Sequence, residues 1–150
     1  MARIRILLAL AVAICAIGAI TASSAAAGSP ESLMMKKVNH YRKSHGLHAV
    51  HLSRSLKHSA ARYARYMRDH QYFGHQSRIR ASSHYRRLGE ILEVQRGGAN
   101  VSLAFHTWLR SSPHRAIILD SSFTYAGAGR AYGRYRGHKS TFWVMHFGRP

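Results

Sequence analysis

Cysteine is almost absent from this sequence of 150 residues, and the only one, Cys15, lies in an apolar N-terminal segment. Ile14 precedes it, where a lipoprotein signal would have a small residue, so we expect no lipid anchor here. Residues 28–150 contain no cysteine, so a domain formed by them folds without disulfides. Such a domain depends on its hydrophobic core, and ~120 residues can bury enough surface to form one.

Long apolar runs are also lacking. The longest covers residues 6–20, which is shorter than the ~20 residues that a helix needs to span a bilayer. Arg3 and Arg5 precede this run and small residues ending at Ala27 follow it, a pattern typical of a secretory signal peptide. We predict a signal peptide over residues 1–27, one domain over residues 28–150, and a secreted, extracellular or cell-envelope location. An uncleaved N-terminal anchor is the alternative.

Acidic residues are scarce, with five Asp and Glu against 23 Lys and Arg. Arg3 and Arg5 belong to the predicted leader, so residues 28–150 carry 21 basic residues against the five acids, a net charge of +16. A field of this size attracts polyanions such as wall polymers, anionic lipid headgroups or extracellular nucleic acid. No signature of a nucleic-acid-binding fold accompanies the charge, which favours general anion binding over sequence-specific recognition.

Capping residues and apolar spacing predict the helices. Ser29 and Pro30 open a first helix, which Gly46 ends. Ser53 caps a second helix, whose apolar residues recur at helical spacing. These residues are Leu56, Ala60, Tyr63, Ala64 and Met67. Further helical segments are expected over residues 82–88, 100–110 (stopped by Pro113) and 116–119.

The C-terminal part changes character and predicts strands. Residues 124–133 and 140–148 are rich in aromatic, small and β-forming residues, and residues 134–139 join them. We interpret them as two antiparallel strands and their hairpin. Three helices before a terminal hairpin indicate an α+β layered domain.

The order of several motifs resembles the CAP superfamily, also called the SCP or PR-1 family, in its bacterial secreted branch. The motifs span nearly all of the predicted domain. They are Val38-Asn39-x-x-Arg42, Gly46-Leu47, Leu56-x-x-x-Ala60, Phe73-x-His75, Gly89-Glu90, Trp108-x-x-Ser111-x-x-His114-Arg115, Ile118-Leu119, Gly127-x-Gly129 and Trp143 to Gly148. The resemblance implies a three-layer α-β-α sandwich.

The resemblance also implies a central cleft with two histidines and two acids. By motif, His75 and His114 match the two histidines and Glu90 matches the first acid. Ser111 stands where many eukaryotic members of the family have the second Glu. Bacterial members often have Ser at this position. Ile91 stands where the family usually has Asn after Glu90, so a polar contact of the cleft is expected to be lost or replaced.

The cleft residues predict metal chemistry as one option. His75, Glu90 and His114 could bind Zn²⁺ or another divalent cation and leave a fourth position for water. Without metal, Glu90 would raise the pKa of its histidine partners and lower its own. Glu90 and Ser111 are the candidate catalytic residues, with Ser111 or Ser112 as a conceivable nucleophile beside His114. His106 and His146 lie among expected core positions, and their roles stay open.

Two basic clusters predict anion-binding surfaces. One lies on the predicted hairpin, where cations alternate with Tyr132 and Tyr135. Its cations are Arg130, Arg134, Arg136 and Lys139, and the second cluster comprises Arg78, Arg80, Arg86 and Arg87. An ordinary solvated loop is the plainer interpretation of either cluster.

Together these features predict a monomeric extracellular binding module with a His/Glu cleft and a basic surface. Its ligand would be an anionic cell-envelope polymer or lipid, or a small apolar molecule. The alternatives are a metal-dependent hydrolase that uses the same cleft and a purely structural envelope protein.

Overall fold

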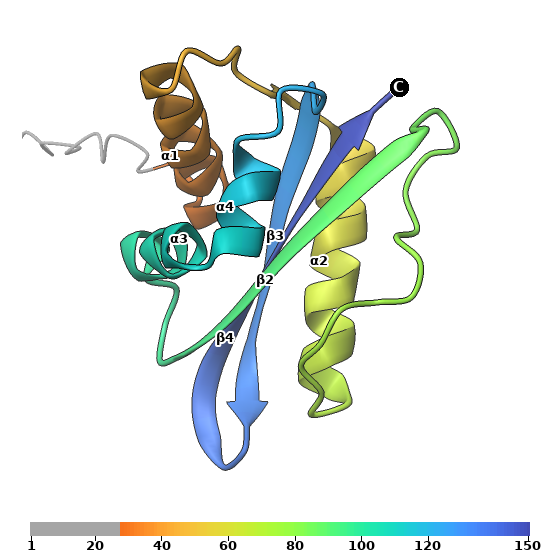
Figure 1. Cartoon of the computed structure of the whole chain (residues 1–150). Coiled ribbons are helices and arrows are strands. Elements are labelled where there is room, and N and C mark those ends of the chain that lie inside the picture. The colour runs from red at the N-terminus through yellow and green to blue at the C-terminus, as the bar shows by residue number, and fades with distance from the viewer. Residues whose placement is uncertain (1–27) are drawn as a thin grey trace, which may run out of the picture.

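The computed structural model describes residues 28–150 and shows three layers, with a four-stranded sheet between helices (Figure 1). In chain order the elements are α1 (Pro30–Ser44), β1 (His51–Leu52), α2 (Arg54–Asp69), β2 (Arg87–Arg96), α3 (Val101–Arg110), α4 (Ser112–Ile118), β3 (Tyr125–Tyr135) and β4 (His138–Arg149). This confirms the predicted α+β class. The predicted signal peptide lies outside the described residues.

The sheet has the strand order β1-β3-β4-β2, so β2 lies at one edge. β1 pairs in parallel with β3, whereas β3, β4 and β2 pair antiparallel. In this register Glu90 on β2 lies directly opposite His146 on β4. Among residues 28–150, no helix is long and apolar enough to cross a membrane.

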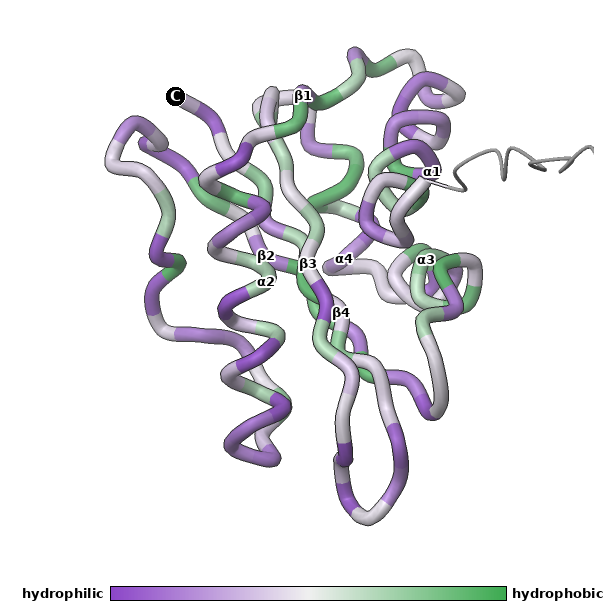
Figure 2. The backbone as a smooth tube through the Cα atoms, turned by 180° about the vertical axis from the view of Figure 1, so that it is seen from behind, coloured by the Kyte–Doolittle hydropathy of each residue, from purple (hydrophilic) through white to green (hydrophobic). Residues whose placement is uncertain are grey.

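Two hydrophobic cores fill the spaces on either side of the sheet. The larger core joins one face to α1, α3 and α4 and contains both tryptophans, Trp108 and Trp143. The smaller core joins the other face to α2, where Tyr63 and Met67 pack against Phe142. Figure 2 shows hydrophilic residues recurring along α2, because only one stripe of this helix faces the sheet.

The helix starts confirm the capping predictions. The hydroxyl of Ser29 accepts the N–H of Ser32, and that of Ser53 accepts the N–H of Leu56. At α3, the side chain of Asn100 accepts the N–H of Leu103. Each cap satisfies a backbone donor that the helix itself leaves free.

The Gly127-x-Gly129 motif lets β3 touch the backbone of α2. A Cβ atom at Gly127 would lie 2.2 Å from the nitrogen of Lys57, and one at Gly129 would lie 2.2 Å from the nitrogen of Ala61. Both distances are far shorter than any van der Waals contact. Glycine at these positions therefore fixes how closely α2 approaches the sheet.

Arg42 is buried and ties α1 to the segments before β3. Its guanidinium donates to the carbonyl oxygens of His48, Ile118, Asp120 and Phe123 over 2.7–3.1 Å. Burial is the main reason that the pKa of Arg42 is lowered, and Asp120 partly opposes this. Four accepting carbonyls replace the water that the charge loses on burial.

Three local predictions need correction. The expected helix over residues 82–88 is wrong, because these residues lead into β2, which begins at Arg87. Pro113 does not simply end α3. It lies in the first turn of α4, where proline needs no N–H partner. The hairpin strands extend further than predicted, with a tight turn at Arg136 and Gly137, both at positive φ.

Candidate functional site

The predicted site residues His75 and Glu90 meet at the edge strand β2. His75 lies in the segment between α2 and β2, and its Nδ1 is 2.9 Å from Oε1 of Glu90. The His75 side chain is 59% exposed whereas that of Glu90 is only 5% exposed. Glu90 thus forms the floor of the site and His75 presents its outer ring edge to solvent.

A second histidine binds the same carboxylate from inside the protein. His146 is completely buried, and its Nε2 lies 2.9 Å from Oε2 of Glu90. With a proton on Nε2 the His146 ring donates this bond, and its Nδ1 has no hydrogen-bond partner in the described structure. The sequence alone does not decide the role of His146. The pairing of β2 with β4 brings this histidine to Glu90.

Gln76 completes the set of groups around Glu90. Its side-chain amide donates to Oε2 over 2.6 Å, and its backbone N–H donates to Oε1 over 3.3 Å. Burial alone would raise the pKa of Glu90, but the hydrogen bonds from His146, Gln76 and His75 outweigh it and lower the pKa. The carboxylate is therefore ionised and held by donors on both oxygens.

His114 approaches from the other face of the sheet, on α4. Arg87 pairs with Asp120 over 2.7 Å, and a Cβ at Gly89 would lie 3.3 Å from Ile117, so α4 runs antiparallel to β2. This direction brings His114 to the middle of β2, where its ring centroid is 6.3 Å from that of His75. Burial, and then the charge of His75, lower the pKa of His114.

The two serines and Ile91 do not extend this network. Ser111 is the N-cap of α4, yet its hydroxyl makes no capping bond, and no hydrogen bond joins it or Ser112 to His114 within the described part of the chain. Ile91 is fully buried in the larger core. The residue after Glu90 thus serves packing, while Gln76 supplies the polar contact to the carboxylate.

The residues present do not fit a zinc centre with three protein ligands. Within residues 28–150 no group of three His, Cys, Asp or Glu side chains is placed to hold one ion. Both oxygens of Glu90 already accept hydrogen bonds, so this carboxylate orients His75 instead of facing an ion. Two imidazoles on one tetrahedral zinc would have centroids about 5 Å apart, closer than His75 and His114.

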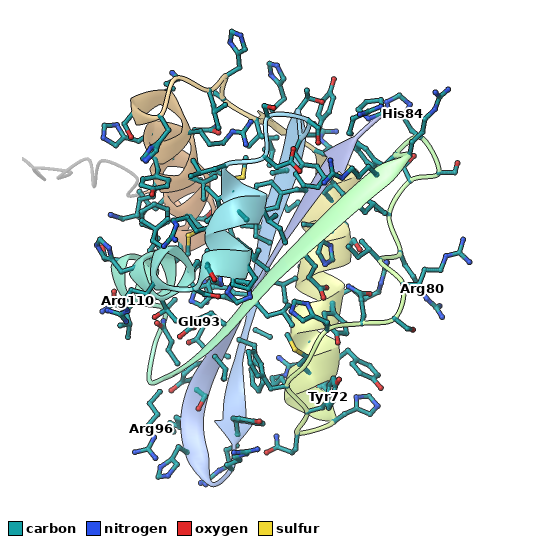
Figure 3. The ribbon with its side chains drawn as sticks, viewed as in Figure 1. Tyr72, Arg80, His84, Glu93, Arg96 and Arg110 are labelled. Atoms are coloured by element: carbon teal, nitrogen blue, oxygen red, sulfur yellow. The ribbon has the colours of Figure 1, made fainter. Side chains whose placement is uncertain are left out.

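Glu93 is a second buried acid on β2, and no motif in the sequence predicts its burial. It lies on the opposite face from Glu90, beside α3 and α4 (Figure 3). The residue is 8% exposed and its Oε2 has no hydrogen-bond partner among residues 28–150. Burial raises the pKa of Glu93 to about 7.

The remaining three acids are all paired with arginine at the surface. Asp69 pairs with Arg68, Asp120 with Arg87 and Glu31 with Arg130, over 2.7–2.9 Å. Three arginines are thus paired and Arg42 is buried, so the other 17 of the 21 Lys and Arg in residues 28–150 lie outside the core without a carboxylate partner. Of the predicted clusters, Arg78, Arg80, Arg86, Arg134, Arg136 and Lys139 belong to this unpaired set.

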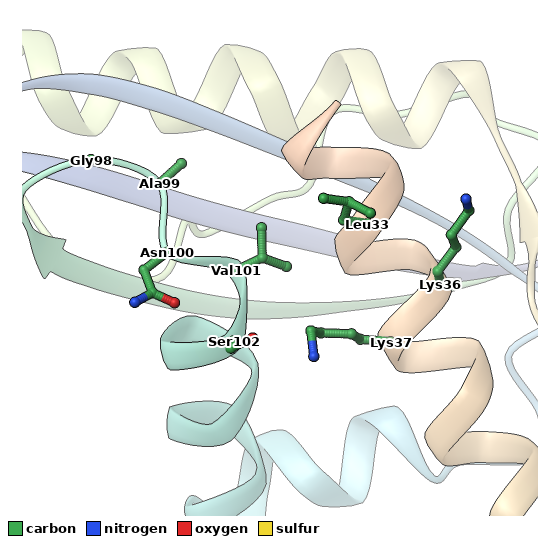
Figure 4. Close-up of a pocket in the computed structure, with 8 residues that line it drawn as sticks. All are labelled: Leu33, Lys36, Lys37, Gly98, Ala99, Asn100, Val101 and Ser102. Atoms are coloured by element: carbon green, nitrogen blue, oxygen red, sulfur yellow. The ribbon is translucent and has the colours of Figure 1, made fainter. Parts of the chain in front are cut away.

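A groove of about 670 Å³ lies away from the histidines, between α1 and the start of α3 (Figure 4). Its apolar walls include Leu33, Ala99 and Val101, and Lys36 and Lys37 stand on the α1 side. No local sequence pattern predicts this groove, because its two walls are more than 60 residues apart in the chain.

Comparisons with known proteins agree with this architecture. Residues 35–147 match the family model described as CAP, the cysteine-rich secretory protein family. No curated protein matches the chain. An outer surface protein of Borrelia burgdorferi has a similar structure with a TM-score of 0.64 and 16% identity, over 79% of this chain and 90% of that one.

Two further solved structures show the same fold. An extracellular protein of Bacillus anthracis that contains an SCP domain matches with a TM-score of 0.59 and 22% identity, over 81% of this chain. This match covers only 40% of the Bacillus protein. Venom allergen-like protein 4 of Schistosoma mansoni matches with a TM-score of 0.61 and 12% identity, over 81% of this chain and 88% of that one.

Proposed function

This chain belongs to the CAP family, and we propose that it is an extracellular binding module for an anionic ligand of the cell envelope. The observation that carries the proposal is the pairing of charges within residues 28–150. Every surface carboxylate there is held by an arginine, while 17 Lys and Arg outside the core have no carboxylate partner. The surface therefore offers an anion many cations and almost no repulsion.

The α2 layer holds the largest share of the unpaired cations, seven of the 17. Residues 54–86, which form α2 and the segment that follows it, contain eight Lys and Arg and a single acid, Asp69, which Arg68 neutralises. The layer of α1, α3 and α4 carries fewer cations and more of the larger core. An extended anion would thus find its strongest attraction over α2.

The His–Glu site adjoins this basic layer. His75 lies in the segment that follows α2 and exposes its outer ring edge, and the fixed carboxylate of Glu90 orients that ring. An oriented imidazole can donate to a phosphate or carboxylate oxygen of a bound ligand. In this proposal the site gives a specific contact and the surrounding arginines give the affinity.

The affinity of the purified protein for inorganic polyphosphate tests this proposal. Fluorescence anisotropy with labelled polyphosphate should show binding at 50 mM NaCl that weakens about 100-fold by 200 mM, as expected if about four cations contact the chain. Neutral dextran of similar length is the control and should not bind. Equal binding of dextran, or polyphosphate binding unaffected by salt, contradicts the proposal.

The groove between α1 and the start of α3 supports a second candidate ligand, a small apolar molecule. Leu33, Ala99 and Val101 offer apolar surface, and Lys36 and Lys37 stand at its side, a combination that suits a single apolar chain with an acidic head (Figure 4). Displacement of a fluorescent fatty acid measures this binding. Lys36→Glu with Lys37→Glu should weaken it, and unchanged affinity would exclude these lysines from the site.

The hydrolase alternative has a direct test of its own. It requires zinc at His75, Glu90 and His114, an arrangement that the hydrogen bonds of Glu90 do not favour. Isothermal titration of the protein with Zn²⁺ decides the question. Stoichiometric binding that His114→Ala abolishes would support the alternative, and the absence of binding heat would reject it.

A further inference from the structure

Exposed aromatic side chains collect at one end of the molecule. Within residues 28–150, seven large hydrophobic side chains are exposed, and three of them fall within residues 66–73. These are Tyr66 in the last turns of α2 and Tyr72 and Phe73 just after it, each 38–47% exposed. The other four, Leu33, Leu52, Leu103 and Tyr132, lie singly on other elements. We call Tyr66, Tyr72 and Phe73 the aromatic patch.

The aromatic patch is held in place. The ring of Tyr66 stacks between those of Tyr63 and His70, with centroids 5.9 and 4.0 Å away. Tyr63 is buried, and its hydroxyl donates to the carbonyl of Gly74, directly after Phe73. The backbone N–H of Tyr72 donates to Met67 over 2.9 Å. These contacts fix the backbone that carries Tyr66, Tyr72 and Phe73. The three exposed rings are therefore held in position at the surface.

The β3–β4 hairpin extends to the same end. Gln71 donates to the carbonyl of Arg134 over 2.7 Å, which joins the end of α2 to the hairpin. Figures 1 and 3 show the hairpin tip and the end of α2 with Tyr72 at the same end of the molecule. The tip adds Arg136 and Lys139, both exposed and without a carboxylate partner in the described chain.

Arginines flank the aromatic patch along the chain, and the hairpin tip at the same end of the molecule adds further cations. Arg62 and Arg65 lie on α2 before it, Arg78 and Arg80 follow it, and the hairpin tip stands beside it. The one acid nearby, Asp69, is neutralised by Arg68 over 2.7 Å. The end thus combines apolar rings with a net positive charge.

We propose that this end docks on an anionic lipid bilayer, with the aromatic patch in the headgroup region and the arginines on the lipid phosphates. The proposal rests on the proposed function and names its ligand. Aromatic side chains favour the membrane interface, and basic residues add attraction to anionic lipids. A hydrophilic polymer would use the arginines but would gain nothing from Phe73, which has no polar atom in its side chain. The aromatic patch therefore favours a bilayer over a polymer.

Vesicle co-sedimentation tests the docking. The protein should bind vesicles of phosphatidylglycerol and phosphatidylcholine at 100 mM NaCl and should not bind vesicles of phosphatidylcholine alone. Tyr72→Ser with Phe73→Ser should reduce the partition coefficient about tenfold while affinity for soluble polyphosphate stays unchanged. The matched control, Leu52→Ser with Leu103→Ser, removes two other exposed apolar side chains and should leave vesicle binding unchanged.

A spectroscopic readout locates the contact. Both tryptophans are fully buried, so Phe73→Trp adds an exposed indole whose emission should shift to shorter wavelength on the anionic vesicles. An unshifted emission from vesicle-bound protein would overturn the proposed orientation. Polyphosphate binding without vesicle binding, or equal losses in the aromatic and control variants, would overturn the bilayer proposal alone. Failure to bind either polyphosphate or vesicles would overturn the proposed function as well.

Discussion

The buried acid Glu93 should make the stability of this protein fall as the pH rises. Its pKa is raised from 4.5 to about 7 because the side chain is buried. In the unfolded chain Glu93 loses its proton near pH 4.5, whereas in the folded protein it keeps the proton until about pH 7. Between these two values the folded state binds more protons, so the free energy of unfolding decreases with increasing pH.

The size of the effect follows from the pKa difference. Each unit corresponds to about 1.4 kcal/mol, so the shift makes ionisation of Glu93 cost about 3 kcal/mol of stability above pH 7. Gln has nearly the shape of a protonated Glu and cannot ionise. Glu93→Gln should therefore match the natural protein at pH 4.5 and exceed its stability by about 3 kcal/mol at pH 8.

Urea unfolding at four or five pH values measures this difference. All other ionisable groups are the same in both proteins, so subtracting the two curves isolates the contribution of Glu93. The expected difference grows from near zero at pH 4.5 and levels off above pH 7.5. A difference that does not change with pH, or a variant that is less stable at pH 8, would refute the assignment of a buried, protonated carboxyl.

Three further substitutions have expected outcomes in the same unfolding assay. Glu90→Gln should lose about 1–3 kcal/mol at pH 7 and approach the natural protein as the pH falls below 4, because a carboxylate with a lowered pKa stabilises the fold only while it is ionised. Arg42→Lys should cost about 3 kcal/mol, since an ammonium cannot serve all four carbonyls; a loss under 1 kcal/mol would contradict this. Gly129→Ala should cost about 3 kcal/mol or more by forcing α2 away from β3, whereas Gly98→Ala, with nothing within 4 Å, should change stability by less than about 1 kcal/mol. Equal effects at the two glycines would show that the close approach is not needed.

The helical layers could be predicted because their signals are local. The apolar stripe of α2 and the caps at Ser29 and Ser53 each depend on residues within a few positions. The terminal hairpin was predicted for the same reason. Its length was underestimated because Arg134 and Lys139, which belong to the predicted loop, pair with one another near the end of the strands.

Strand β2 was missed because both of its faces are buried and both contain acids. Glu90 points to the α2 side and Glu93 to the α1 side, so residues 87–96 show no alternation of apolar and polar residues. A strand with this pattern can be recognised only when its partner strand is known. Pairing with β4 explains each acid separately, since it brings His146 to Glu90 and leaves Glu93 opposite Trp143.

The candidate site was partly foreseen through the family resemblance. His75, Glu90 and His114 were chosen by motif, and the structure brings His75 to Glu90 and brings His114 near His75. His146 was not chosen, because β4 is a central strand whose buried run from Ser140 to Gly148 resembles core throughout. The register between β2 and β4 decides which residue of β4 faces the carboxylate of Glu90. This register depends on residues far apart in the sequence.

The most direct test of the anion-binding surface compares two double charge reversals of equal size. Arg62→Glu with Arg65→Glu changes the α2 layer, and Lys43→Glu with Arg110→Glu changes the opposite layer, in both cases at exposed residues. Polyphosphate affinity at 100 mM NaCl should fall at least about tenfold more for the α2 pair than for the other pair. If the two pairs weaken binding equally, only the total charge matters and no surface of this protein is specialised for its ligand.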